Sequence, residues 1–72
     1  MIFVKYYRND LVTEEPTVEV YFSILTTTAN IADLHSQAIE FSKRHPTAVA
    51  YQLFEGPHFR STKPIGLQHY LI

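Results

Sequence analysis

The stretch NIADLHSQAIEFSKRHP, residues 30–46, decides the fold, because it is the one segment with an unambiguous helical period. Its apolar residues recur at alternating spacings of three and four, which places them along one side of an α-helix. A helix of this length is marginal by itself, so the rest of the chain must bury that side. The residues of the apolar side are Ile31, Leu34, Ala38 and Phe41, with Ile39 on its flank.

Both ends of this helix carry residues that helix ends prefer. Asn30 suits the N-cap, where its side chain accepts a hydrogen bond from the backbone of Asp33, and Thr28 is the alternative cap. The basic residues 43–45 suit the carbonyls exposed at the C-terminal end. Pro46 disfavours a helical conformation in the residue before it, so we expect the helix to end there.

Two segments before the helix alternate in the way of β-strands. Residues 2–8 combine β-branched and aromatic side chains, and residues 17–24 show the cleanest alternation in the chain. An acidic loop that ends in Pro16 joins them, so the two strands most simply form an antiparallel hairpin. The side chains predicted to face the helix are Ile2, Val4, Tyr6, Val18, Val20, Phe22 and Ile24.

The segments after the helix complete a sheet. Residues 48–55 are apolar on both parities, which is typical of a central strand, and Gly56-Pro57 predicts a turn that closes it. Residues 58–62 suit a fourth strand or an irregular return, and residues 67–72 predict a terminal strand at a sheet edge. The predicted fold class is α+β: a mainly antiparallel sheet of four to five strands with one helix packed on one face, in the order ββαββ(β).

The length predicts a single compact domain over residues 1–72. A domain of this size buries only about 60% of its unfolded surface and keeps roughly 4–11 kcal/mol of net stability. The chain has no cysteine, which excludes a disulfide, a thiolate metal site and a cysteine nucleophile. With so small a core, association with a second copy stays an open alternative.

Charge and hydropathy limit the partners that we expect. No basic segment followed by an apolar run opens the chain, and no apolar run approaches the roughly 18 residues of a membrane span. We therefore expect a cytoplasmic protein with no membrane partner. Six Lys and Arg against seven Asp and Glu give a net charge of −1, which argues against general electrostatic capture of nucleic acid.

Residues that carry chemistry do not gather in the sequence. A phosphate-binding loop needs several glycines, whereas Gly56 and Gly66 are the only two and lie in separate turns. The four histidines are too far apart for any two to share a helical turn or alternate positions of a strand, so their spacing predicts no metal site. We expect no enzyme, no cofactor and no metal.

The sheet face away from the helix is the predicted binding surface. Five Tyr and five Phe are more than so small a core can hold, and tyrosine is enriched at protein interfaces. We expect a host or cellular protein as the partner; the alternative is that Tyr7 and Tyr21 form a purely structural cross-strand pair. The predicted partner-binding residues are Phe3, Lys5, Tyr7, Arg8, Glu19, Tyr21 and Arg60.

Two other functions use the same face. Nucleic acid would stack its bases on the aromatic rings, with Arg60 and Lys63 near the phosphates. The acidic Glu19, the negative net charge and the lack of an aromatic–glycine RNA-binding motif argue against it. In the third reading a second copy of the chain closes the face, and the protein is a homodimer.

The segment ADLHSQAIEFSKRHPTAVAYQLFEG, residues 32–56, resembles a pattern in very small phage-encoded proteins. The pattern is a strand pair, a short helix, a break and a strand that ends in Glu-Gly. Small early inhibitors of host RNA polymerase made by podoviruses have a similar layout. The resemblance covers residues 17–56 and carries no functional residue over. It implies a non-enzymatic protein that binds and occludes a host complex.

Overall fold

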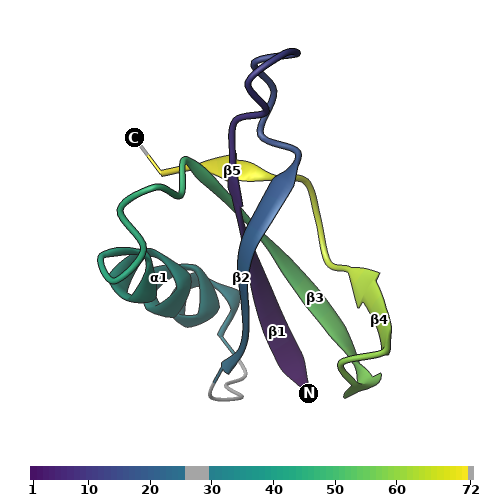
Figure 1. Ribbon diagram of the computed structural model, residues 1–72. Coiled ribbons are helices and arrows are strands. Elements are labelled where there is room, and N and C mark those ends of the chain that lie inside the picture. Colours follow the sequence, from purple (N-terminus) through teal and green to yellow (C-terminus); the bar gives the residue numbers. More distant parts are fainter. Residues whose placement is uncertain (26–29, 72) are drawn as a thin grey trace.

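The computed structural model, which describes residues 1–25 and 30–71, has an α+β fold with one helix and an antiparallel sheet of five strands (Figure 1). The predicted α+β class, with one helix and a mainly antiparallel sheet of about five strands, is therefore confirmed. In chain order the elements are β1 Ile2–Arg8, β2 Val18–Leu25, α1 Ile31–Ser42, β3 Ala50–His58, β4 Ser61–Pro64 and β5 His69–Tyr70.

Strands β1 and β3 form the centre of the sheet. The strand order is β2-β1-β3-β4, and β5 also pairs with β3. Every strand pairing is antiparallel, so β1 and β2 form the predicted hairpin. Because β1 occupies one side of β3, both β4 and β5 lie along the other side, and β2 forms the opposite edge of the sheet.

Helix α1 begins where the sequence predicts. The Asn30 side chain accepts a hydrogen bond from the Ala32 N–H at 2.9 Å, and the Asn30 carbonyl accepts one from the Asp33 N–H at 3.1 Å. The side-chain bond thus comes from Ala32 and not from Asp33. The alternative cap, Thr28, lies outside the described residues.

Within residues 1–25 and 30–71, no helix has the length and hydropathy that a membrane span needs.

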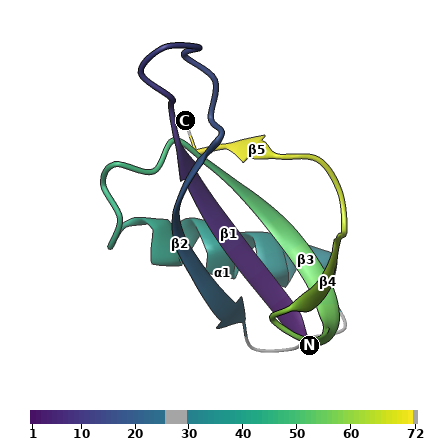
Figure 2. The same ribbon diagram turned by 45° about the vertical axis from the view of Figure 1, so that its right-hand side comes forward.

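The core lies between α1 and the centre of the sheet, and Figure 2 shows the helix crossing behind the strands. Tyr6 is fully buried there, and its hydroxyl donates a hydrogen bond to the carbonyl of Ala38 on the helix. Burial, with smaller contributions from Tyr51 and Tyr21, raises the pKa of Tyr6 to about 12, so its hydroxyl stays a donor at neutral pH. The buried residues of this cluster are Val4, Tyr6, Leu25, Leu34, Ala38, Tyr51 and Leu53.

A β-bulge in β2 reverses the alternation of its side chains. Tyr6 pairs with Tyr21, but the next residue, Tyr7, pairs with Glu19, so Val20 is an extra residue on β2. One extra residue moves every following side chain to the other face of the sheet. The two halves of β2 therefore follow opposite patterns.

The predicted orientation of the second half of β2 is wrong for this reason. Phe22 and Ile24 lie directly opposite Lys5 and Phe3, on the face away from the helix. Leu25 instead faces the helix and is 3% exposed. Alternation predicts only the relative orientation of neighbouring residues, and it cannot reveal a bulge that depends on the partner strand.

The predicted turn at Gly56-Pro57 is also wrong, because β3 continues through these residues to His58. The chain turns at residues 59–60 instead. The pairing of β3 with β4 shifts register between Glu55 and His58, which makes Gly56-Pro57 part of a second bulge. A bulge tolerates proline, since the missing N–H is not needed for the ladder.

The C-terminal segment docks on the sheet of its own chain. The strand predicted over residues 67–72 is shorter, and β5 pairs with β3. The Leu71 N–H donates to the Val49 carbonyl at 3.0 Å, which extends this contact by one residue. Ile72 lies outside the described residues.

Candidate functional site

The sheet face opposite α1, which we call the outer face, carries a cluster of phenylalanine rings. Phe3 is paired with Phe54 on β3, and its ring stacks on that of Phe22 on β2 at 5.3 Å between centroids. Phe3 is only 5% exposed and Phe54 only 8%. Because α1 covers the other face (Figure 2), the side chains of the outer face must bury these rings themselves.

The ammonium group of Lys5 lies over this cluster. It is 4.8 Å from the centroid of the Phe54 ring and 5.4 Å from that of Phe22. It is also 3.7 Å from the Glu19 carboxylate. A cation over an aromatic ring is stabilised by about 0.5–1 kcal/mol at exposed sites, and an exposed ion pair adds little. Two rings and one carboxylate therefore hold a positive group in place at the centre of the outer face.

The edge of the cluster is half-exposed at Ile24 and polar at Tyr7 and Glu19. Ile24 is 51% exposed beside Phe3. Tyr7 lies opposite Glu19, and burial followed by the nearby Glu19 charge raises the pKa of its phenol above the ordinary value of 10.0. Tyr7 is therefore a hydrogen-bond donor at neutral pH. An apolar centre with a polar rim is the usual composition of a protein interface.

The structure gathers part of the predicted binding set on this face. Phe3, Lys5 and Tyr7 lie there together with Glu19, as strand alternation predicts. Tyr21 does not, because the bulge directs it to the helix side, where its ring stacks on His45 at 4.0 Å. The predicted placement of Tyr21 on this face is therefore wrong.

The predicted arginines lie apart from the cluster. Arg8 ends β1 and donates a hydrogen bond to the Asn9 carbonyl at 3.1 Å. Arg60 lies in the β3–β4 turn, where its guanidinium is 5.4 Å from the Phe59 ring. Figure 1 shows this turn beside the N-terminus, at the end of the sheet opposite the end of β1. Neither predicted arginine thus makes a described contact with the aromatic rings of the cluster.

Phe22, Ile24 and Phe54 belong to the outer face but are absent from the predicted set. For Phe22 and Ile24 the cause is the bulge at Val20, which alternation does not detect. Phe54 lies on a strand that is apolar on both parities, so the sequence alone does not distinguish its two faces. The pairing of Phe3 with Phe54 supplies that information.

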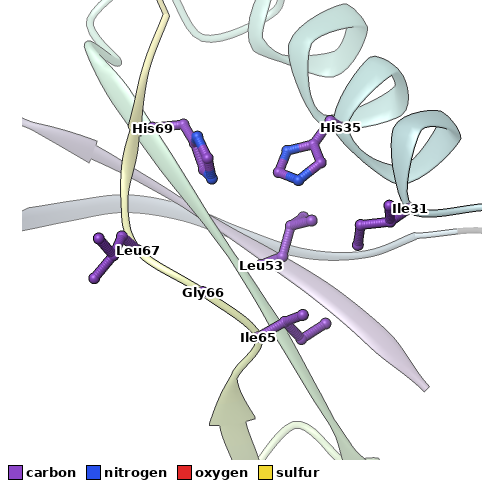
Figure 3. A pocket seen from close by; sticks show the side chains of 7 residues that line it. All are labelled: Ile31, His35, Leu53, Ile65, Gly66, Leu67 and His69. Atoms are coloured by element: carbon purple, nitrogen blue, oxygen red, sulfur yellow. The ribbon is translucent and has the colours of Figure 1, made fainter.

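A second group of polar rings lies on the helix side. His35 Nδ1 and the Tyr51 hydroxyl are 2.7 Å apart, and the His69 ring is 4.7 Å from His35 and 5.4 Å from Tyr51. Figure 3 shows the two imidazoles side by side at one end of a small pocket of about 80 Å³, with Leu53 below them. The remaining lining is Ile31, Ile65, Gly66 and Leu67. Within the described chain no three potential metal ligands of the His, Cys, Asp and Glu types come together.

This group makes the stability of the fold depend on pH. Burial, and secondly the nearby His69, lowers the pKa of His35 below its ordinary value of 6.5. The folded state then binds fewer protons than the unfolded state, so the stabilisation is present above pH 6.5 and is lost as the pH falls below it. We expect the thermal unfolding midpoint to decrease between pH 7.5 and pH 5.5, as followed by circular dichroism.

The His35→Gln variant should show a smaller decrease over the same range. His58 is exposed, so His58→Gln is the matched control and should keep the decrease seen in the unsubstituted protein. An identical decrease in the His35→Gln variant would contradict this assignment.

Comparison of the chain with known protein families, with curated proteins and with solved structures found no match. The resemblance of residues 17–56 to small phage-encoded proteins therefore stays a prediction. Function has to be inferred from the geometry of the chain itself.

Proposed function

We propose that this protein is a non-enzymatic interaction module that binds another protein through its outer face. The observation that carries the proposal is the ordered cluster of Phe3, Phe22 and Phe54 with the Lys5 ammonium over two of its rings. The exposed side of an antiparallel sheet is normally polar. An apolar cluster on that side is typical of a contact surface.

The charges of the outer face favour a protein partner over nucleic acid. Binding of phosphates requires positive charge that is not compensated within the protein. Lys5 is paired with Glu19, and the Arg60 guanidinium lies beside the Phe59 ring of the β3–β4 turn, not over the rings of the cluster. The half-buried Phe22 ring and the half-exposed Ile24 suit an apolar anchor of the partner, and Lys5 and Tyr7 suit its carbonyl or carboxylate oxygens.

Two isoleucines of similar exposure provide the test. Ile24 on the outer face is 51% exposed and Ile39 on α1 is 47% exposed, so Ile24→Glu and Ile39→Glu introduce the same charge on different surfaces. We expect Ile24→Glu to weaken capture of a partner protein by at least about tenfold, or about 1.4 kcal/mol, while Ile39→Glu leaves it unchanged. Quantitative affinity capture from a nuclease-treated lysate, with identification by mass spectrometry, measures this.

The thermal unfolding midpoints of the two variants must be compared in parallel, because an unfolded variant also fails to bind. Equal capture of the same protein by both variants would remove the outer face as the binding surface. Capture that disappears with nuclease treatment would favour the nucleic-acid function instead.

A further inference from the structure

Strand β2 is a long edge of the sheet, and the bulge at Val20 interrupts it near its start but leaves residues 21–25 regular. In the described chain only β1 pairs with it. Natural proteins usually protect an edge with lysine, proline or a very short strand, since its free N–H and C=O groups can pair with another chain. The eight residues of β2, VEVYFSIL, include neither lysine nor proline. Its one charged residue, Glu19, lies near Lys5 of the same chain.

The other edge of the sheet is protected in the usual way. Strand β4 has four residues and contains both Lys63 and Pro64. Strand β5, on the same side of β3, has only two residues. The contrast between the two edges indicates that pairing with another strand is suited to β2 alone among the described strands.

The hydrogen-bond pattern shows which backbone groups of β2 point outward. The Gly56 N–H donates to the Met1 carbonyl at 3.1 Å, and these residues are opposite each other in the register of β1 and β3. Bonded and non-bonded pairs alternate along an antiparallel ladder. The odd-numbered residues of β1 therefore bond to β3, and the even-numbered residues bond to β2.

The partners of those even-numbered residues are Leu25, Ser23 and Tyr21. The backbone groups of the intervening Phe22 and Ile24 then point away from β1. Within residues 1–25 and 30–71 they have no backbone partner, and the Ile24 carbonyl accepts only a long 3.4 Å bond from the Ser23 hydroxyl.

The regular part of β2 is symmetric about Ser23. After the bulge it runs from Tyr21 to Leu25, with Ser23 at its centre. We propose that two copies of this protein pair through this segment, antiparallel, with Ser23 of each copy at the two-fold axis. The result is a homodimer with one continuous sheet.

Side chains and charges suit this register. On the outer face, Phe22 lies beside the partner's Ile24 and Ile24 beside the partner's Phe22. Aromatic and β-branched residues are favourable cross-strand neighbours. The half-exposed Ile24 becomes covered. Glu19 falls outside the paired segment, so the Glu19 carboxylates of the two copies do not face each other. A two-fold contact places the same surface of each copy against the other, so it tolerates no uncompensated like charges.

The first test changes one outward-pointing N–H. The Ile24→Pro substitution removes the outward-pointing N–H of residue 24 and keeps every hydrogen bond between β2 and β1. Proline is tolerated on an edge strand where its nitrogen faces outward. Ile24→Thr is the matched control, because it keeps the N–H and the branched shape. In sedimentation equilibrium up to about 100 μM, we expect the unsubstituted protein and Ile24→Thr to dimerise, and Ile24→Pro to dimerise at least about tenfold more weakly.

The second test uses the absence of cysteine from the chain. Ser23 pairs with the partner's Ser23 as a non-bonded pair, in which Cα atoms lie about 4.5 Å apart, within the range of a disulfide. Ser23→Cys should therefore form a disulfide-linked dimer under mild oxidation. Ser61→Cys, on the protected β4 edge, should stay unlinked under the same conditions.

A protein that is purely monomeric at about 100 μM would overturn the proposal, because even a dimer with a small interface should form at that concentration. So would a dimer that survives Ile24→Pro or that cross-links through Ser61→Cys and not through Ser23→Cys. If Ile24→Pro fails to fold, the cysteine pair decides. These measurements use the protein alone, so they are independent of whether the outer face binds another protein.

Discussion

Replacement of Tyr6 with alanine is expected to remove a large part of the free energy of unfolding. The Tyr6 side chain is fully buried at the centre of β1, within ring contact of His45 at 5.5 Å and of Tyr21 at 6.4 Å. Truncation of a buried aromatic residue to alanine costs about 3–5 kcal/mol. That is comparable to the total stability of roughly 4–11 kcal/mol for a chain of this size. Urea denaturation followed by circular dichroism measures the loss.

The variant Tyr6→Phe separates packing from hydrogen bonding at this position. It keeps the ring and removes only the hydroxyl that donates to the Ala38 carbonyl, the direct bond between β1 and α1. Loss of such a bond costs about 0.5–1.5 kcal/mol, so Tyr6→Phe should stay folded with a lower urea midpoint. Equal stability of Tyr6→Ala and Tyr6→Phe would show that ring packing against α1 does not hold the fold together.

The helix could be predicted because its signals are local. The Asn30 cap and the period that buries Leu34 and Ala38 depend on residues within a few positions of each other. Its first apolar residue is less buried than the period suggests, since Ile31 is 51% exposed beside the small pocket. Terminal residues of a short helix extend past the surface they pack against, which local periodicity does not show.

The outer face could be predicted only in part, because the facing of a strand depends on its pairing. Strand β1 has no bulge of its own, so Phe3, Lys5 and Tyr7 lie where alternation puts them. On β2 the bulge at Val20 reverses the alternation that follows, so Phe22 and Tyr21 lie on the faces opposite to those predicted. The bulge is set by the register between two strands, and residues far apart in sequence decide that register.

The pairing of β5 is a further non-local feature that the sequence does not supply. His35, Tyr51 and His69 come from three elements, and their spacing predicts no cluster. They meet because β5 pairs with β3 at Tyr51, while α1 brings His35 over the same residue. The alternation of residues 67–72 indicates a strand but not the strand with which it pairs.

Replacement of Gly56 with alanine is expected to open the β3–β4 hairpin. A Cβ at this position would lie 1.9 Å from the Ser61 carbonyl oxygen and 2.9 Å from the Thr62 Cα. Both atoms belong to the backbone, so no side chain can rotate away to make room. We expect a loss of about 2–3 kcal/mol, the upper part of the usual range for overpacking, measured as a lower urea midpoint.

Gly66 provides the matched control for this prediction. Neither glycine has a positive φ, so alanine is compatible with the backbone at both positions, and a Cβ at Gly66 would meet nothing within 4 Å. Gly66→Ala should therefore change the stability by less than about 0.5 kcal/mol, as surface substitutions usually do. The difference between the two variants isolates the close approach of β4 to the bulge in β3. Equal midpoints would mean that Gly56 does not lie against the backbone of Ser61 and Thr62.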